Sequence, residues 1–200
     1  MFLYGAGGHC RAIVEILQVS KVAVHAIFDD KPISKDIEGI PVLNTSSLVV
    51  RKNNKWVIAI GSNTIRKTIS KKLNARYLQI SHKSSIVSQS SPIGSGSVVM
   101  AGVIINANSF IGEHCIINTG VIIEHDCVIR DFVHLAPRTI IAGNVEIGEG
   151  TFIGINSSVI PGVKIGKWVI AGAGSVIIKD VPDYAVVVGA PARIIRFQNH

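Results

Sequence analysis

The sequence predicts two folds in succession: an α/β unit built on a parallel sheet, followed by a parallel β-helix. The first part alternates strand-like and helix-like segments that meet at glycine-rich turns. The second part repeats every six residues from Ile93 to Pro182 without interruption. A chain of 200 residues with 48% hydrophobic residues has room for both cores. We expect domains over residues 1–84 and 85–182, closed by a turn and tail over 183–200.

The α/β unit follows from the order of its segments. Apolar runs and helical spacing predict strands over 1–4, 22–28 and 55–60 and helices over 10–18 and 64–73, with a looser stretch over 37–43. Strands that alternate with helices form a parallel sheet, because each helix carries the chain back to the same end. We therefore expect a small Rossmann-like sheet.

The carboxyl ends of these strands carry the candidate ligand residues. Parallel sheets bind ligands at that edge, and the residues that follow the three strands are Gly7, Gly8 and His9, then Asp29 and Asp30, then Gly61 and Asn63. Each group also has a plainer explanation, as a tight turn or a solvated acid. Together they predict a nucleotide site. Cys10 stands where a dinucleotide motif has glycine, and the domain is short, so one nucleotide is expected rather than NAD.

The six-residue repeat predicts the β-helix. Three hexads close one triangular coil, so residues 18 apart lie on adjacent coils about 4.8 Å apart. A small or β-branched residue stands four places after each core position, which lets the chain turn. Periodicity leaves the handedness open. The core positions are Ile93, Val99, Ile105, Ile111, Ile117, Ile123, Ile129, Leu135, Ile141, Ile147, Ile153, Val159, Ile165, Ala171 and Ile177.

Charge separates the two parts. Residues 1–85 hold 13 Lys/Arg against 5 Asp/Glu, a balance of +8, whereas the remainder holds 7 against 8, a balance of −1. A basic domain attracts anions. No nucleic-acid motif accompanies it and aromatic residues are only 6%, so we expect a small phosphorylated ligand and no nucleic-acid partner.

Hydropathy and cysteine usage suggest a location. The sequence has no apolar run long enough to span a membrane and no leader, which predicts a cytoplasmic protein without membrane insertion. Cys10, Cys115 and Cys127 are scattered and odd in number, so they are expected to be buried apolar residues in a reducing compartment.

His125 is the candidate catalytic base. Histidine has the unperturbed pKa closest to neutrality, and of the three histidines in the repeat only His125 has acids on both sides, Glu124 and Asp126. Without further support it is equally an exposed turn residue. The 18-residue register places Gly143 above it, where a backbone N–H suits a carbonyl oxygen that gains charge. His114, His125 and His134 do not stack, so no metal is expected.

Several segments resemble one family. They are Gly5-Ala6-Gly7-Gly8-His9, Phe28-Asp29-Asp30, Ala59-Ile60-Gly61-Ser62-Asn63, Ile117-Asn118-Thr119, the run from Ile123 to Ile129, Ala142-Gly143-Asn144-Val145 and the run from Val188 to Arg193. The whole chain is similar to bacterial nucleotide-sugar N-acetyltransferases of the PglD and NeuD type. The resemblance implies a left-handed β-helix and acetyl transfer from acetyl-CoA to the 4-amino group of a UDP- or GDP-linked 4-amino-4,6-dideoxyhexose. O-acetylation of a sialic acid, or nucleotide-sugar binding without catalysis, remains the alternative.

The resemblance also assigns further roles. It implies that Asn118 binds substrate, that His134 contacts the thioester acetyl group, and that Ile155 and Ala173 line the pantetheine groove. Asp126 stands where the family commonly has Glu, so Asp126 or Glu124 could orient His125. A homotrimer with active sites between subunits is also implied. Phe110, Phe132 and Phe152 are expected to be exposed on it.

Overall fold

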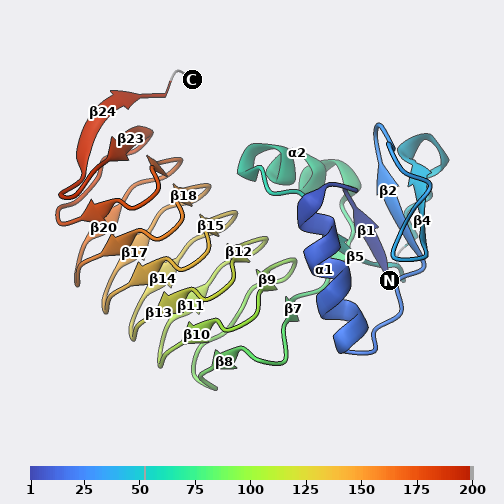
Figure 1. Cartoon of the computed structure of the whole chain (residues 1–200), viewed down its shortest axis with the longest axis horizontal. Coiled ribbons are helices and arrows are strands. Elements are labelled where there is room, and N and C mark those ends of the chain that lie inside the picture. The colour runs from blue at the N-terminus through green and yellow to red at the C-terminus, as the bar shows by residue number, and fades with distance from the viewer. Residues whose placement is uncertain (52, 199–200) are drawn as a thin grey trace.

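The computed structural model describes residues 1–51 and 53–198, which form a parallel sheet with helices followed by a long β-helix (Figure 1). The predicted order of folds is confirmed. The first sheet has the strand order β3-β4-β2-β1-β5-β6. Its elements are β1 (Phe2–Tyr4), α1 (Gly8–Val19), β2 (Ala26–Asp29), β3 (Asp36–Ile37), β4 (Ile40–Asn44), a 3-10 turn (Thr45–Ser47), β5 (Lys55–Ile58), α2 (Asn63–Leu73) and β6 (Arg76–Tyr77).

Each face of this sheet packs on its own apolar cluster. Strand residues alternate between the two faces, so Leu3, Ile27 and Val57 pack with α1. Trp56 and Ile69 belong to the cluster on the α2 side. The three central strands β2, β1 and β5 are parallel, and their carboxyl ends lie together.

The sheet differs from the prediction at its outer strands. β2 begins at Ala26 rather than residue 22, because the N–H of Val22 still bonds to the Leu17 carbonyl at the end of α1. The looser stretch forms a hairpin of β3 and β4, which turns at Gly39 with positive φ and adds β4 parallel to β2. Strands as short as these contain too few alternating polar and apolar residues to be recognised in the sequence.

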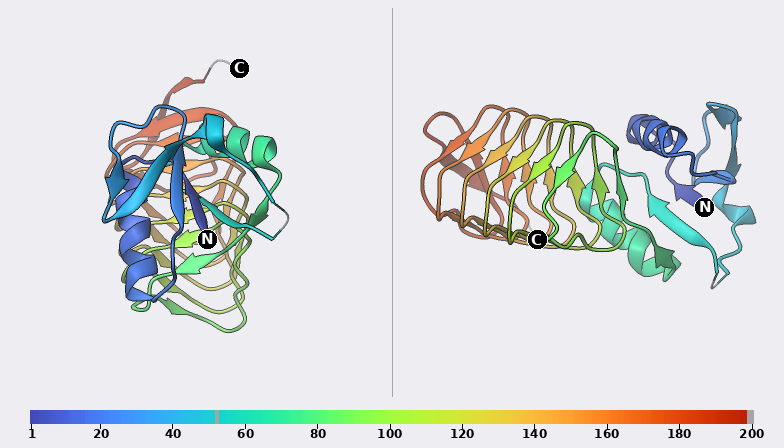
Figure 2. Two further views of the ribbon diagram at one scale, coloured as in Figure 1. Left: turned by 90° about the vertical axis from the view of Figure 1, so that its right-hand side faces the viewer. Right: turned by 90° about the horizontal axis from the view of Figure 1, so that it is seen from below.

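The β-helix has three flat faces, each a parallel sheet, seen end-on and from the side in Figure 2. Strand partners are 18 residues apart, as in Ile116↔His134 and His134↔Phe152, which confirms the predicted register. The core positions from Val99 to Ile177 are at most 2% exposed.

We number the faces by the strands they contain. Face 1 contains β7 (Ile80–Ser81), β9 (Val98–Val99), β12 (Ile116–Ile117), β15 (His134–Leu135), β18 (Phe152–Ile153), β21 (Ile170–Ala171), β23 (Ala185–Val188) and the antiparallel β24 (Arg193–Phe197). Face 2 contains β8 (Ile86–Val87), β10 (Ile104–Ile105), β13 (Ile122–Ile123), β16 (Ile140–Ile141), β19 (Ser158–Val159) and β22 (Val176–Ile177). Face 3 contains β11 (Phe110–Ile111), β14 (Val128–Ile129), β17 (Glu146–Ile147) and β20 (Lys164–Ile165).

The corners join these faces in a fixed order along the chain. The 1–2 corner holds residues 118–120, 136–138, 154–156 and 172–174, the 2–3 corner holds 106–108, 124–126 and 142–144, and the 3–1 corner holds 112–114, 130–132 and 148–150. The third residue of each corner takes a left-handed conformation, including Asp126 at φ 59° and Asn144 at φ 59°. The small residue that follows is buried and bonds backbone groups, as Ser109 does with Glu124 O and Cys127 N.

A buried arginine joins the two domains. Arg66 of α2 is 1% exposed, and its guanidinium donates to the carbonyls of His114 (2.7 Å) and Phe132 (2.9 Å) on the 3–1 corner. It also donates to the carbonyls of Ile60 and Gly61 in its own domain. No carboxylate pairs with it within the described ranges, so burial lowers the pKa of Arg66 to about 10. The contact fixes α2 along the 3–1 corner.

The expected exposure of three phenylalanines is confirmed at one of them only, because Phe132 is buried and Phe152 is half-buried. Phe132 is only 9% exposed, because its ring stacks on His114 and lies under the Lys67 ammonium of α2. Phe110 is 43% exposed on face 3, as predicted. The cysteines are buried and free. Within the described residues, no helix has the length and apolar character that crossing a bilayer would require.

Candidate functional site

His125 lies on the 2–3 corner with its side chain 57% exposed. Its Nδ1 is 2.7 Å from Asp126 Oδ2. This hydrogen bond, together with one from Asn108, lowers the pKa of Asp126, so the ionised carboxylate accepts and Nδ1 carries the proton. Nε2 is then the basic nitrogen. Glu124 instead accepts from Asn106, which leaves Asp126 as the residue that orients the imidazole.

Gly143 packs directly against this imidazole, as the register predicted. A Cβ on Gly143 would lie 2.7 Å from Cε1 and 2.8 Å from Nε2 of His125. The N–H of Gly143 takes part in no hydrogen bond within the described residues. A basic nitrogen and a free N–H donor are therefore neighbours, which is the pair that acyl transfer to an amine requires.

Gly143→Ala is expected to lower kcat by about 10²-fold, because the new methyl group displaces the His125 ring by the order of 1 Å. The ring is exposed and can move aside, so the thermal midpoint should stay near that of the parent protein. Steady-state kinetics and thermal unfolding of the same sample measure both. Parental turnover in this variant would show that the contact has no part in the reaction.

The opposite end of the candidate site is the edge of the first sheet. Gly7 and Gly8 are exposed at the start of α1, and a Cβ on Gly7, Gly8 or Gly61 would meet nothing within 4 Å. No side chain caps α1, so its first N–H groups are open to an anion. His9 is half-buried, and burial and then Arg66 lower its pKa to about 4, which keeps it neutral.

The two aspartates and Asn63 have structural partners. Asp29 accepts from the N–H groups of Ala6 and Lys31 and so shapes the glycine turn. Asp30 accepts from Thr45 and Tyr4, which lowers its pKa. Asn63 is 8% exposed, and its amide donates to the Gly150 and Thr151 carbonyls and accepts from Arg66. Its side chain therefore takes part in the domain contact, and Asn63 also lines a cavity at this contact.

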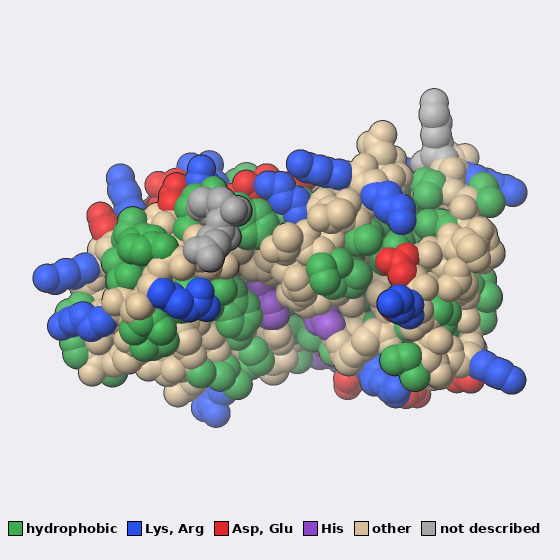
Figure 3. All heavy atoms as spheres, turned by 90° about the horizontal axis from the view of Figure 1, so that it is seen from above, with side chains coloured by type: hydrophobic (Ala, Val, Ile, Leu, Met, Phe, Trp, Pro, Cys, Tyr) green, Lys and Arg blue, Asp and Glu red, His purple; other side chains and the backbone are tan. Residues whose placement is uncertain are grey.

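His134 links this sheet edge to the β-helix. Its Nδ1 is 3.4 Å from the Gly61 carbonyl and its Nε2 is 3.2 Å from Asn118 Nδ2. Burial, Arg66 and His9 lower its pKa to about 3. Figure 3 shows histidine side chains gathered between the two domains. A cavity of about 290 Å³ opens beside them, lined by Gly61, Ser62, Asn63, Thr64, Gly150, Phe152, Trp168, Ile170 and Gln198.

The predicted site residues thus form two groups within one chain. His134 and Asn118 lie on face 1 and its 1–2 corner, where Ile155 and Ala173 are also exposed, and Gly61 of the first domain contacts His134. His125, Asp126 and Gly143 lie on the 2–3 corner, which is opposite face 1. Face 2 separates the groups.

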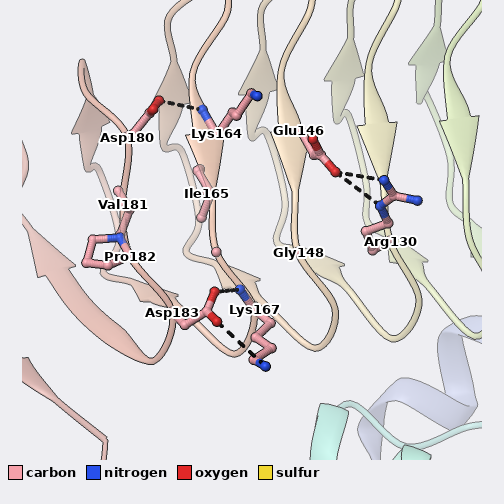
Figure 4. A pocket seen from close by; sticks show the side chains of 11 residues that line it. Arg130, Glu146, Gly148, Lys164, Ile165, Lys167, Asp180, Val181, Pro182 and Asp183 are labelled. Atoms are coloured by element: carbon pink, nitrogen blue, oxygen red, sulfur yellow. Dashed lines mark hydrogen bonds and ion pairs between the residues drawn. The ribbon is translucent and has the colours of Figure 1, made fainter.

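A second cavity of about 550 Å³ lies over face 3 (Figure 4). Two of its three basic side chains pair with acids: Arg130 with Glu146 at 2.8 Å, and Lys167 Nζ with Asp183 at 3.7 Å. Asp180, beside Lys164, accepts from the backbone N–H of that lysine. Positive charge there is already balanced, which argues against a dedicated anion site.

Sequence reasoning missed the residues that join the domains. Lys67 pairs with Glu149 at 2.5 Å and lies over the Trp168 ring at 5.2 Å. Arg66 bonds to backbone carbonyls, which carry no side-chain signature. The signal that could have revealed this contact is the face of α2 that carries Asn63, Arg66 and Lys67 together.

Comparisons with known proteins match both parts. The model of the PglD N-terminal domain matches residues 1–73, that of the bacterial transferase hexapeptide matches 144–179, and that of the succinyl-transferase hexapeptide repeat matches 103–130. The fold and the histidine site define a hexapeptide-repeat acyltransferase.

Two acetyltransferases are among the solved structures that are similar over nearly the whole chain. A perosamine N-acetyltransferase from Caulobacter crescentus, a variant with one histidine replaced by asparagine in complex with CoA and GDP-perosamine, is 37% identical, covers 96% of this chain and 95% of its own, and has a TM-score of 0.90. The acetyltransferase domain of PglB from Neisseria gonorrhoeae in complex with acetyl coenzyme A is 33% identical, covers 97% and 98%, and has a TM-score of 0.89. The chain belongs to the PglD-like family of nucleotide-sugar N-acetyltransferases.

A curated relative agrees over a shorter region. The UDP-N-acetylbacillosamine N-acetyltransferase of Bacillus subtilis is 42% identical over 110 residues, which is 50% of this chain and 50% of that protein. The match therefore spans about half the length of this relative.

Proposed function

We propose that the protein transfers the acetyl group of acetyl-CoA to the 4-amino group of a UDP- or GDP-linked 4-amino-4,6-dideoxyhexose. The observation that carries this proposal is the exposed His125, with Nδ1 bound to an ionised Asp126 and Gly143 against its ring. The relative with bound CoA and GDP-perosamine supports an amino-sugar nucleotide as acceptor.

The chemistry follows from the two groups on the 2–3 corner. The Nε2 of His125 removes a proton from the amine as the nitrogen attacks the thioester carbonyl. The oxygen gains charge, and the free N–H of Gly143 stabilises it. Collapse of the intermediate forms the amide and breaks the C–S bond, and the imidazolium returns its proton to the CoA thiolate. Asp126 holds the ring and stabilises its charged form.

The acceptor nucleotide is assigned to the first domain. The open N–H groups at Gly7 and Gly8 suit a diphosphate, and the domain carries the excess positive charge. Gly61 and His134 lie at the joint of the domains, so a sugar attached to this nucleotide would extend toward face 1. This places the acceptor far from the same chain's His125.

In a homotrimer, the His125 group of one protomer lies beside the acceptor domain of the next. Face 2 presents a column of aliphatic side chains, in which Ile86 is 67% and Ile140 is 46% exposed and Ile104 and Ile122 are half-buried. Packing face 2 around a three-fold axis buries this column. It also brings the 2–3 corner of one protomer beside the 1–2 corner and face 1 of the next.

The assembled site then combines residues from two chains. One protomer contributes His125, Asp126 and Gly143, and its neighbour contributes Asn118, His134 and the acceptor domain. Ile155, which is 50% exposed, and Ala173 line the groove between them, where pantetheine is expected. We place the reaction in the cytoplasm, since the three cysteines are free.

Release of free thiol from acetyl-CoA tests the function. A panel of UDP- and GDP-linked 4-amino-4,6-dideoxyhexoses should contain an acceptor, and the matched 4-hydroxy sugars should not react. Because hydroxylamine cleaves esters but not amides, the product should resist it. A hydroxylamine-sensitive product, or a sialic acid as preferred acceptor, would replace this proposal with O-acetylation. Nucleotide-sugar binding without thiol release would indicate a non-catalytic protein.

A further inference from the structure

Donor and acceptor rules fix the hydrogen-bond roles around His134. The Asn118 Oδ1 atom accepts from the N–H of Thr119 at 2.8 Å, which identifies it as the oxygen and Nδ2 as the amide nitrogen. Nδ2 can only donate, so His134 Nε2 at 3.2 Å accepts through its lone pair. The proton of a neutral imidazole is then on Nδ1, which donates to the Gly61 carbonyl.

The surroundings keep His134 neutral. The groups that face it are the Arg66 guanidinium, the neutral His9, the Gly61 carbonyl, the Asn118 amide and the edge-on Phe152 ring at 5.1 Å. Burial of the ring opposes a positive charge on the imidazole, and the Arg66 cation adds to this effect. The low pKa of about 3 agrees with this geometry.

We propose that His134 is a positioning residue: as the Nδ1–H tautomer, it transmits the position of the acceptor domain, through Gly61, to the Asn118 carboxamide. Both ring nitrogens are engaged, so His134 has no N–H to offer a thioester carbonyl. The second N–H of Asn118 Nδ2 is then the hydrogen-bond donor to the acetyl oxygen of acetyl-CoA. The identity of that ligand rests on the proposed function. Asn118 thus takes the contact with the thioester acetyl group that the family resemblance implied for His134.

The ligand-free protein provides the first test. With imidazole-15N-labelled histidine, and His134→Gln to assign the signals among the seven histidines, His134 should have a protonated Nδ1 and an unprotonated Nε2. These signals should not titrate between pH 8 and about 5, since the pKa lies near 3. An Nε2–H tautomer, or titration near neutrality, would overturn the proposal. This measurement needs no substrate, so it stands even if acetyl transfer fails.

Kinetics of two His134 variants, with an NMR titration of an Asn118 variant, give the second test. Gln offers an oxygen to Asn118 and an N–H to Gly61, so His134→Gln should keep kcat within about tenfold of the parent, whereas His134→Leu should lose about 10²-fold. Asn118→Asp replaces the donor with an acceptor and should raise the His134 pKa into the observable range. If His134→Gln is as damaged as His134→Leu while both fold, His134 acts on the substrate directly and the relay is wrong.

Discussion

His125→Ala is expected to lower kcat by about 10²–10⁴-fold while the KM values for both substrates change little. The reason is that Nε2 of His125 is the basic nitrogen on the 2–3 corner, held by Asp126 at 2.7 Å. Because the side chain is 57% exposed, its removal leaves no cavity and the fold should be unaffected. Thiol release at saturating acceptor and donor measures the effect.

Two further variants sharpen this prediction. His82→Ala removes an imidazole from the start of the β-helix and should leave kcat unchanged. Asp126→Asn keeps the shape but can present an N–H to Nδ1, which moves the imidazole proton to Nε2 and blocks the base, so kcat should fall by about 10²-fold or more. Near-parental turnover in His125→Ala would remove this residue from the mechanism.

Arg66→Ala is expected to lower the free energy of unfolding by about 3–5 kcal/mol, because several acceptors at the joint lose their donor. The variant loses the donor for the carbonyls of His114 and Phe132 and for the Asn63 side chain, which are buried, and for the part-buried carbonyls of Ile60 and Gly61. Arg66→Lys keeps the charge but lacks the planar guanidinium with its several N–H donors. It should therefore recover only part of the lost free energy of unfolding.

Denaturant unfolding at one fixed protein concentration measures this effect. In a Trp168→Phe background, the fluorescence of Trp56 reports the first domain, where that residue is fully buried. Lys71→Ala, on the exposed side of α2, is the matched control. A loss no larger in Arg66→Ala than in this control would show that the joint does not depend on the guanidinium.

The repeat made most of the β-helix predictable. A strict hexad forces residues 18 apart into contact, so the pairing of Gly143 with His125 followed from counting alone, and the structure places the two groups together. Acids on both sides of His125 did not reveal which one orients it. That depends on the left-handed turn at Asp126 and on Asn106, which engages Glu124.

The domain joint was not predictable from these patterns. Asn63 was predicted to bind the nucleotide because it follows a strand end, and nothing in the sequence indicated its bonds to carbonyls 87 and 88 residues away. Phe132 has the sequence pattern of an exposed turn residue, but the His114 ring and the Lys67 ammonium of α2 cover it. Backbone acceptors have no residue type, so tertiary contacts of this kind leave little trace in a sequence.

The most direct measurement of the central claim is complementation in mixed trimers. His125→Ala and the double variant Asn118→Ala/His134→Ala should each be nearly inactive, because each lacks one side of the shared site. The two variant chains carry different tags, are co-expressed, and are purified through both tags, so every trimer contains both. In each such trimer, one of the three interfaces joins an intact His125 to an intact Asn118 and His134. The mixed trimers should recover about one third of the parental kcat per ring. Mixed trimers no more active than the separate variants would contradict an acetyl-transfer site shared between neighbouring protomers.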